Sequence, residues 1–197
     1  MSTNTTTNTA ANVSTGKPAV AGSVFCAAAG TTLPTSAVAT LATTFKALGY
    51  VSEDGLTNDQ SFDSDSIKAW GGDTVTTLEN NKEDKFKFAL LETLNVDVMK
   101  AVNEDDNVTG SALSSGFSIK ANAKEHTPKA WVFDMILKGN VLKRICVPSA
   151  AITEIGEIVY KDDEAIMYEV TITATPDSAG NTHYEYIQTP TTPPSST

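Results

Sequence analysis

The sequence predicts a mainly β fold: an antiparallel β-sandwich or barrel with one or two short helices, a long loop and extended terminal arms. Several short segments alternate apolar and polar residues, and turn-forming residues separate them. Hydrophobic residues make up 40% of the 197 residues and charged residues 19%, which suits one packed domain. No apolar run approaches the roughly 18 residues that a helix needs to span a bilayer.

The composition divides the chain into three parts. Residues 1–16 are rich in Ser, Thr, Asn and Ala and predict a flexible N-terminal arm, because such a segment buries too little apolar surface to fold alone. Residues 17–177 carry the alternating segments and predict one β-sandwich domain. Residues 178–197 end in a tail of Pro, Thr and Ser and predict a C-terminal extension.

The first part of the domain gives mixed signals. Lys17–Ala29 is apolar but broken by a proline and a glycine, which favours a strand over a secretion signal. Ser36–Leu48 repeats apolar residues at helical spacing, although its threonines favour an extended alternative. Ser52–Asp65 is polar and contains the turn signal Asp54-Gly55, so we expect a long loop there.

Clearer strand and helix signals follow in the middle of the chain. A strand is expected over Asp73–Leu78, and in Lys85–Leu94 apolar residues alternate with lysines. Asn95 is a typical N-cap for a short helix over Val96–Val102. A further alternating segment covers Phe117–Ala121.

Two hairpins are predicted in the last third of the domain. Trp131–Leu137 and Val141–Val147 flank the turn signal Lys138–Asn140. Glu157–Tyr160 and Ala165–Thr175 flank a second, charged turn. The polar residues that alternate along these strands predict a sheet with one face in water.

The charge balance excludes tight binding of nucleic acid. The formal net charge is -10, and binding to phosphates requires clustered Lys and Arg. An acidic surface can instead let DNA pass without adhering, because like charges repel.

No motif in the sequence supports catalysis or a bound cofactor. His126 and His183 lie in separate polar segments, and exposed loop histidines are the favoured interpretation. The acidic residues of segment 59–65 lack the glycine and closing glutamate of a calcium loop. Cys26 and Cys146 lie in apolar runs, which favours two isolated buried thiols over a disulfide. We therefore expect no enzyme, no metal and no cofactor.

Several ordered blocks of the sequence resemble the tail tube proteins, or major tail proteins, of long-tailed (siphovirus-type) bacteriophages. The resemblance covers about Gly16 to Asp177, and it departs from many family members at Asn103-Glu104, where they carry Tyr-Gly. The blocks are LGYVSEDGL (Leu48–Leu56), IKAWGGDTV (Ile67–Val75), KFKFALLETLNVDVMKAV (Lys85–Val102) and WVFDMILKGNVLKRICVP (Trp131–Pro148), with Gly30–Pro34 upstream and Ile158–Asp162 downstream.

The resemblance implies a structural subunit of the virion. Such proteins form hexameric rings that stack into a hollow tube, and the inner sheet of each subunit joins its neighbours' sheets around a lumen. The tube holds the tape measure protein during assembly in the host cytoplasm and conducts DNA at infection. Tail tip, or distal tail, and tail terminator proteins are the further partners implied, and no membrane is involved.

Two groups of residues are candidates for assembly and for the lumen. Trp70 beside Gly71 and Gly72 predicts an anchor at the end of the long loop, held against the core or a neighbouring subunit, with the glycines permitting a sharp turn. Tyr50 and Asp54 belong to the same group of anchor candidates. The candidates for lumen-facing side chains are Asp134, Glu169, Thr171 and Thr173.

Three alternatives remain open at this stage. A tail terminator or head–tail joining protein forms a ring that stops instead of stacking. A surface β-sandwich binding module fits the polar ends but requires an export signal or an anchor. A hydrolase requires a nucleophile and a base, and the sequence offers only two histidines for the second role.

Overall fold

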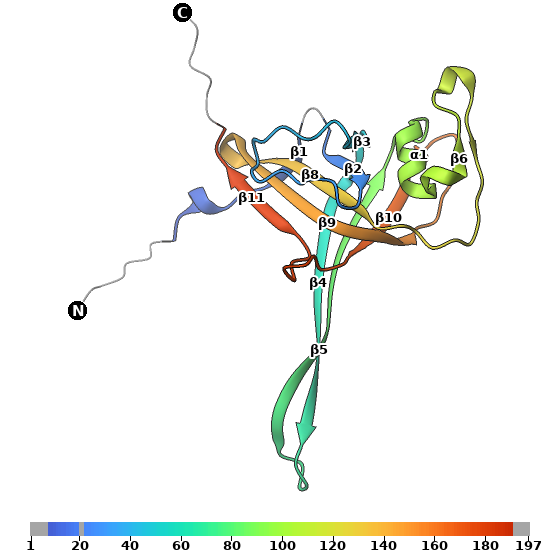
Figure 1. The fold of residues 1–197 in the computed structure, drawn as a ribbon. Coiled ribbons are helices and arrows are strands. Elements are labelled where there is room, and N and C mark those ends of the chain that lie inside the picture. Colours follow the sequence, from blue (N-terminus) through green and yellow to red (C-terminus); the bar gives the residue numbers. More distant parts are fainter. Residues whose placement is uncertain (1–7, 20–21, 191–197) are drawn as a thin grey trace, which may run out of the picture.

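A computed structural model describes residues 8–19 and 22–190 of the chain, and it confirms a mainly β, antiparallel fold with one α-helix (Figure 1). The helix, α1, covers Val96–Asn103. The strands are β1 Gly16–Pro18, β2 Val24–Ala28, β3 Lys46–Ala47, β4 Val51–Lys68, β5 Thr74–Leu90, β6 Val108–Thr109, β7 Ser118–Ile119, β8 Lys129–Leu137, β9 Val141–Ile155, β10 Tyr168–Ala174 and β11 Tyr184–Gln188. Short 3-10 turns are η1 Ala10–Asn12, η2 Asp105–Asn107, η3 Leu113–Ser115 and η4 Lys138–Asn140.

Nine strands form one large sheet in the order β3-β2-β8-β9-β10-β5-β4. Strand β1 adds to β8 and β11 adds to β9, while β6 and β7 form a separate two-stranded sheet. Strand β9 is central because it pairs with β8 on one side and, along its length, with β11 and then β10 on the other. All these pairs are antiparallel.

The large sheet curls so that its two halves face each other. Strands β5 and β8 are three strand spacings apart, about 14 Å in a flat sheet. Yet Phe86 of β5 stacks on Phe133 of β8 with ring centroids 5.6 Å apart, and Phe88 meets Trp131 at 5.7 Å. These aromatic contacts lie inside the main core, together with the buried face of α1. The arrangement is that of a β-sandwich.

A smaller apolar cluster covers the other face of β2, β8 and β9. It is built from Ala27, Phe45, Ala130, Val132 and Cys146. Part of its cover is the segment Ser36–Leu48, for which the sequence predicted a helix.

The helix prediction for Ser36–Leu48 is wrong, because the segment forms bends and the short strand β3. Two of its backbone carbonyls accept hydrogen bonds from a side chain instead of from helical N–H groups. The guanidinium of Arg144 donates to the carbonyl oxygens of Ser36 (3.2 Å) and Ala39 (2.6 Å), and it pairs with both oxygens of Asp134 (2.6 and 2.7 Å). This buried arginine therefore fixes the segment against β8 and β9.

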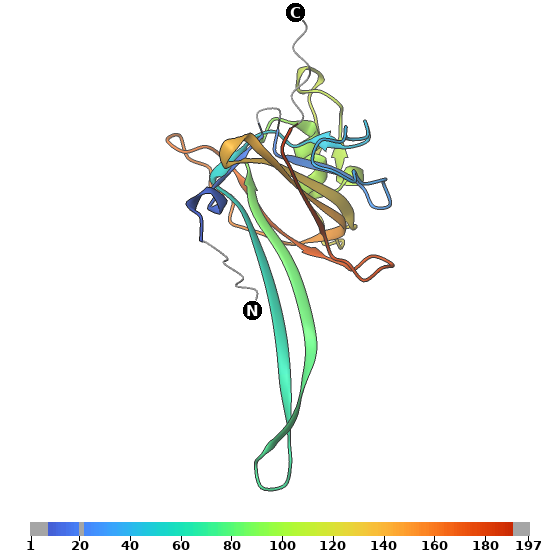
Figure 2. The same ribbon diagram turned by 90° about the vertical axis from the view of Figure 1, so that its left-hand side faces the viewer.

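The predicted loop Ser52–Asp65 is also wrong, because these residues lie in β4, which pairs with β5 from Leu56 onward. Figures 1 and 2 show that the distal part of the two strands projects from the body as a long hairpin. Both faces of this projection are in water, so neither face requires apolar side chains and the sequence shows no strand-like alternation there. The turn signal Asp54-Gly55 marks an irregularity in the pairing between Val51 and Leu56.

The second predicted hairpin is wrong in its first strand. Residues 156–167 lie outside the strands, and β10 pairs instead with β9 and β5. Strand β9 continues past Pro148 to Ile155, through a pairing irregularity near that proline, and its extension supplies the partner of β10. The strand predicted over Phe117–Ala121 is reduced to Ser118–Ile119.

Other elements agree with the sequence. The hairpin of β8 and β9 is confirmed, with a positive φ of 75° at Gly139 in its turn. Helix α1 is confirmed, and the side chain of Asn95 accepts a hydrogen bond from the Asp97 N–H at 3.0 Å. Among the described residues, no helix has the length and apolar content to cross a membrane.

The two terminal segments both contact the body. Ser14 accepts a hydrogen bond from the Lys138 N–H at 2.9 Å, so the described part of the predicted N-terminal arm lies against the β8–β9 turn. The described part of the predicted C-terminal extension contains β11, which pairs with β9. The boundaries 1–16, 17–177 and 178–197 stay a prediction, and residues 1–7 and 191–197 lie outside the described residues.

We predict that Asp134→Ala lowers the free energy of unfolding by about 3–5 kcal/mol, because it leaves a buried guanidinium without its counter-ion. Urea unfolding at neutral pH measures the change. The exposed Glu154→Ala is the control and should stay within about 0.5 kcal/mol of the parent. A loss below about 1 kcal/mol for Asp134→Ala would show that the pair does not hold the Ser36–Leu48 segment.

Candidate functional site

Metal-ligating side chains do not cluster among the described residues. These residues contain no group of three or more His, Cys, Asp or Glu side chains arranged to hold a metal ion. The interpretation of both histidines as exposed is wrong: the side chains of His126 and His183 are 24% and 13% exposed, and each meets a carboxylate. Cys26 and Cys146 are free and buried, as expected, and burial raises the pKa of each thiol to about 12.

Trp70 lies at the tip of the β4–β5 hairpin. The Ala69 N–H donates to the Asp73 carbonyl oxygen (2.8 Å), and the Gly72 N–H donates to the Ala69 carbonyl oxygen (3.0 Å), which closes the turn. Gly71 and Gly72 have φ values of 122° and 101°, which side-chain-bearing residues rarely adopt. The turn role of the glycines is therefore confirmed.

The indole of Trp70 is fully exposed. The expectation that it packs on the core of its own chain is wrong, and contact with a neighbouring subunit stays a prediction. Further large apolar side chains along the same projection are exposed, and the candidates drawn from the sequence did not include them. They are Phe62, Ile67, Val75 and Leu78.

Tyr50 and Asp54 lie at the other end of β4 and are not brought together with Trp70. The Tyr50 backbone is fixed, since its N–H donates to the carboxylate of Glu92 at 3.2 Å, but its ring is exposed. Asp54 is exposed beside the irregularity in β4. The structure therefore separates the predicted anchor residues into a tip group and a base group.

The layer β9-β10-β5-β4 has one apolar and one polar face. Phe86 and Phe88 point into the core, so the residues that alternate with them, Lys85 and Lys87, lie on the outer face. Register places Thr171 opposite Lys87 and Thr173 opposite Lys85, and the Glu169 carboxylate pairs with Lys87 at 2.8 Å. Three of the four predicted lumen residues thus share one wet face.

This polar face carries a net negative charge. The two lysines are outnumbered by carboxylates, and hydrogen bonds and charge attraction from those carboxylates raise the pKa of both ammonium groups. By register and alternation, the acidic residues on this face are Asp59, Asp63, Glu83, Glu154 and Glu169.

Asp134 differs from the other three predicted lumen residues. Its carboxylate is held by Arg144 beneath the Ser36–Leu48 segment, and its side chain is only 18% exposed. The Asp134 carboxylate therefore stabilises the fold of its own chain, and this role does not depend on whether Asp134 faces a lumen.

The layer β9-β10-β5-β4 also has two unpaired edges. At Ala150, β9 pairs with β8 on one side and with β10 on the other. Beyond that residue β8 has ended, so no described strand pairs with residues 151–155 on that side. Strand β4 likewise pairs with β5 alone among the described strands. Unpaired N–H and C=O groups along such edges are templates for strand addition.

Comparison with known families agrees with this architecture. A family model described as phage tail tube protein matches residues 9–197. The chain belongs to the phage tail tube family. It is therefore a structural component of a phage tail. A search of curated proteins found no match.

A buried carboxylate holds the base of the hairpin in this tail tube family member. Asp84 of β5 accepts hydrogen bonds from Asn58 (2.6 Å) and Thr182 (2.6 Å) and contacts His183 Nδ1 at 2.5 Å. The ring of His183 packs edge-on against Phe86, with centroids 5.4 Å apart. The cluster joins the segment before β11 to the point where the hairpin leaves the body.

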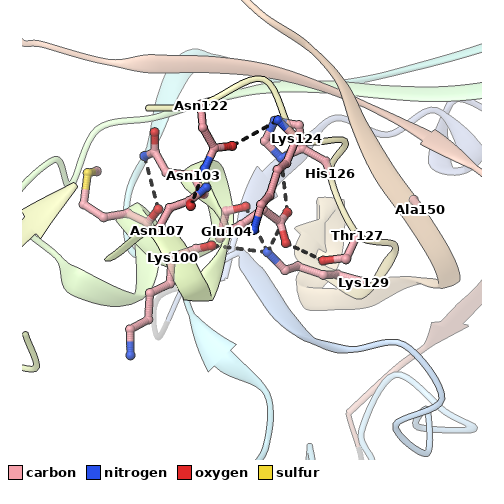
Figure 3. Close-up of polar contacts among 12 residues, drawn as sticks. Lys100, Asn103, Glu104, Asn107, Asn122, Lys124, His126, Thr127, Lys129 and Ala150 are labelled. Carbon is pink, nitrogen blue, oxygen red and sulfur yellow. Dashed lines mark hydrogen bonds and ion pairs between the residues drawn. The ribbon is translucent and has the colours of Figure 1, made fainter. Parts of the chain in front are cut away.

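A second polar cluster fixes the end of α1, as Figure 3 shows. The ammonium of Lys129 donates to the carbonyl oxygens of Lys100 (3.2 Å) and Ala101 (3.4 Å) and to the carboxylate of Glu104 (3.2 Å). Glu104 also contacts Thr127 and His126, and it has an unusual φ of 71°. The cluster joins the start and the end of the long excursion 104–129.

We predict that Glu104→Gln makes stability less dependent on pH between about pH 5 and 3. Burial raises the pKa of Glu104, but its bonds with Thr127 and Lys129 outweigh burial and place the pKa below the ordinary value of 4.5. The native carboxylate therefore adds stability above the unfolded-state pKa, and this stability is lost as the pH falls through the folded-state pKa.

Urea unfolding from pH 7 to 3 tests this prediction. The parent should lose stability more steeply than Glu104→Gln on acidification, and the variant should already be weaker at pH 7. Parallel curves for the two proteins would contradict the assignment.

We predict that His183→Ala loosens β11. Its removal leaves the buried Asp84 carboxylate short of one partner, which costs about 1–3 kcal/mol locally. Hydrogen exchange measured by mass spectrometry should accelerate about tenfold or more in residues 184–188. His126→Ala is the matched control and should leave exchange in β11 unchanged.

Proposed function

We propose that the chain assembles with copies of itself into rings, and that the rings stack into the hollow tube of a phage tail. The observation that carries this proposal is the pair of unpaired edges on one four-stranded layer. Strand β9 is antiparallel to β10, β10 to β5, and β5 to β4, so β4 runs antiparallel to β9. A neighbour's β4 can therefore join residues 151–155 of β9 in a uniformly antiparallel sheet.

Joining the layers in a circle removes both edges at once. A closed barrel has no free edge and does not invite uncontrolled pairing. Six copies, the number that the family resemblance implies, give a barrel of about 24 strands. Barrels of 16 to 18 strands already enclose an aqueous channel, so this barrel has room for a larger lumen.

The polar face of the layer is the face that lines this lumen. The opposite face is filled by the core and covered by α1, so it is not free to contact a lumen. Excess carboxylates repel the phosphates of DNA, which lets the genome pass without adhering. Thr171 and Thr173 add uncharged polar groups to the same face.

The remaining partners follow from the family resemblance. The lumen holds the tape measure protein during assembly, and the tube meets tail tip and terminator proteins at its ends. Assembly takes place in the host cytoplasm, and the finished tube is part of the virion.

Electron microscopy of the purified protein at high concentration tests the proposal. The expected result is hollow tubes of uniform width built from stacked rings. Single rings that do not stack would favour a terminator, and monomers that do not assemble even on a tail-tip template would contradict the proposal.

We predict that Glu154→Lys/Glu169→Lys makes the tube lumen bind DNA. The double variant reverses the charge at two positions on the polar face, and Lys side chains displace counter-ions from phosphates. Short duplex DNA should co-sediment with variant tubes at low salt, but not with parent tubes.

The matched control is Asp105→Lys/Asp106→Lys. It makes the same change in net charge in η2, which follows α1 on the side of the layer away from the polar face. Equal DNA retention by the two variants would contradict the lumen assignment.

A further inference from the structure

The hairpin tip carries an apolar side chain that needs a partner. The indole of Trp70 is fully exposed in its own subunit. Burying this ring against a partner would lower the free energy, because it removes apolar surface from water. From Asp59 to the tip the projection spans 11 residues, or about 35 Å, so it reaches well beyond the body. Figures 1 and 2 show the tip far from every other described element.

The projection is also acidic. Residues 59–83 contain six acidic and two basic residues, a formal net charge of -4. A receiving surface on another subunit should therefore be apolar and should carry positive charge.

One groove at the other end of the molecule has this character. It lies beside the β8–β9 turn, has a volume of about 360 Å³, and is lined by Thr15, Lys17, Ile136, Leu137 and Lys138 among others. Within the described residues neither Lys17 nor Lys138 forms an ion pair, and the Lys138 ammonium donates only a long hydrogen bond, 3.4 Å, to the Ala10 carbonyl oxygen. Figures 1 and 2 place β1 and the β8–β9 turn in the body, away from the hairpin tip.

A second apolar surface competes with this groove. Tyr160, in the segment that joins β9 to β10, is exposed. However, the residues around it are mostly acidic, and its neighbour Lys161 already pairs with Glu164 at 2.9 Å. An acidic hairpin would meet like charge there, which disfavours docking.

We propose that the hairpin tip of one subunit docks in the Lys17/Lys138 groove of a second copy of this chain, in the next ring of the tube. Trp70 lies on the apolar floor of the groove, and the two lysines face the acidic strands. The contact joins different surfaces at opposite ends of the molecule, so it repeats without closing and gives a filament. The inference rests on the proposed function and identifies the contact between rings.

Cross-linking tests the contact directly. Ala69→Cys/Thr15→Cys places thiols beside Trp70 and in the groove, and Ala69→Cys/Tyr160→Cys places the second thiol on the competing surface. The native thiols are buried and stay largely protonated at neutral pH, so they react little. With a short bis-maleimide, tubes of the first variant should give ladders of linked subunits. Ladders from the second variant alone would overturn the inference.

Assembly measurements give a second readout. Lys17→Glu/Lys138→Glu and Trp70→Ala should each raise the critical concentration for tube formation tenfold or more, without changing the thermal midpoint of the monomer. Lys120→Glu/Lys124→Glu, two exposed lysines in the excursion 104–129, is the matched control and should change it less than twofold.

The proposed tube and the proposed docking groove predict different experimental outcomes. If the parent protein forms no tubes, the proposed function fails and the inference fails with it. If parent tubes form but the groove variants assemble like the parent and the first cysteine pair gives no ladder, only the docking site is wrong.

Discussion

The contact between the aromatic residues of β5 and β8 decides most of this structure. Phe86 and Phe88 meet Phe133 and Trp131 across the core, although three strand spacings separate the two strands in the sheet. The sheet must curl to make this contact, so the opposite face of β5, β10 and β4 is turned outward. The aromatic positions thus fix which side chains can face a lumen, because alternation along a strand leaves no freedom once one face is buried.

The same curl leaves the four-stranded layer incomplete. Along β9, pairing with β8 stops at Ala150, where pairing with β10 starts. Among the described strands, β4 has a partner on one side only. A long edge with both faces in water is a liability for a free monomer, because its backbone groups invite other strands. In a ring of identical subunits, the same groups become the bonds between neighbours. The exposed hairpin is thus better explained as part of an assembly than as part of an isolated domain.

The sequence predicted the parts of this fold that are buried on one face. Phe86, Phe88 and Trp131 alternate with polar or opposite-facing residues, and this period of two predicted the strands. Asn95, a typical N-cap residue, predicted the start of α1. Prediction from the sequence failed for segments with no buried face, and for a segment that is held by a side chain instead of by backbone pairing. The projecting part of β4 is in water on both faces and was interpreted as a loop. The segment Ser36–Leu48 is held by Arg144, which no local pattern reveals. Of the site residues, alternation placed Glu169 and Thr171 on the polar face, but it did not indicate that Arg144, across the predicted hairpin, occupies Asp134 in a buried ion pair.

A helical reconstruction of assembled tubes by electron cryomicroscopy tests the central claim most directly. The account predicts that β4 of each subunit pairs antiparallel with residues 151–155 of its neighbour's β9, with Lys87 and Glu169 facing the lumen and α1 outside. Tubes in which α1 lines the lumen, or in which the outer edge of β4 meets only solvent, would contradict it.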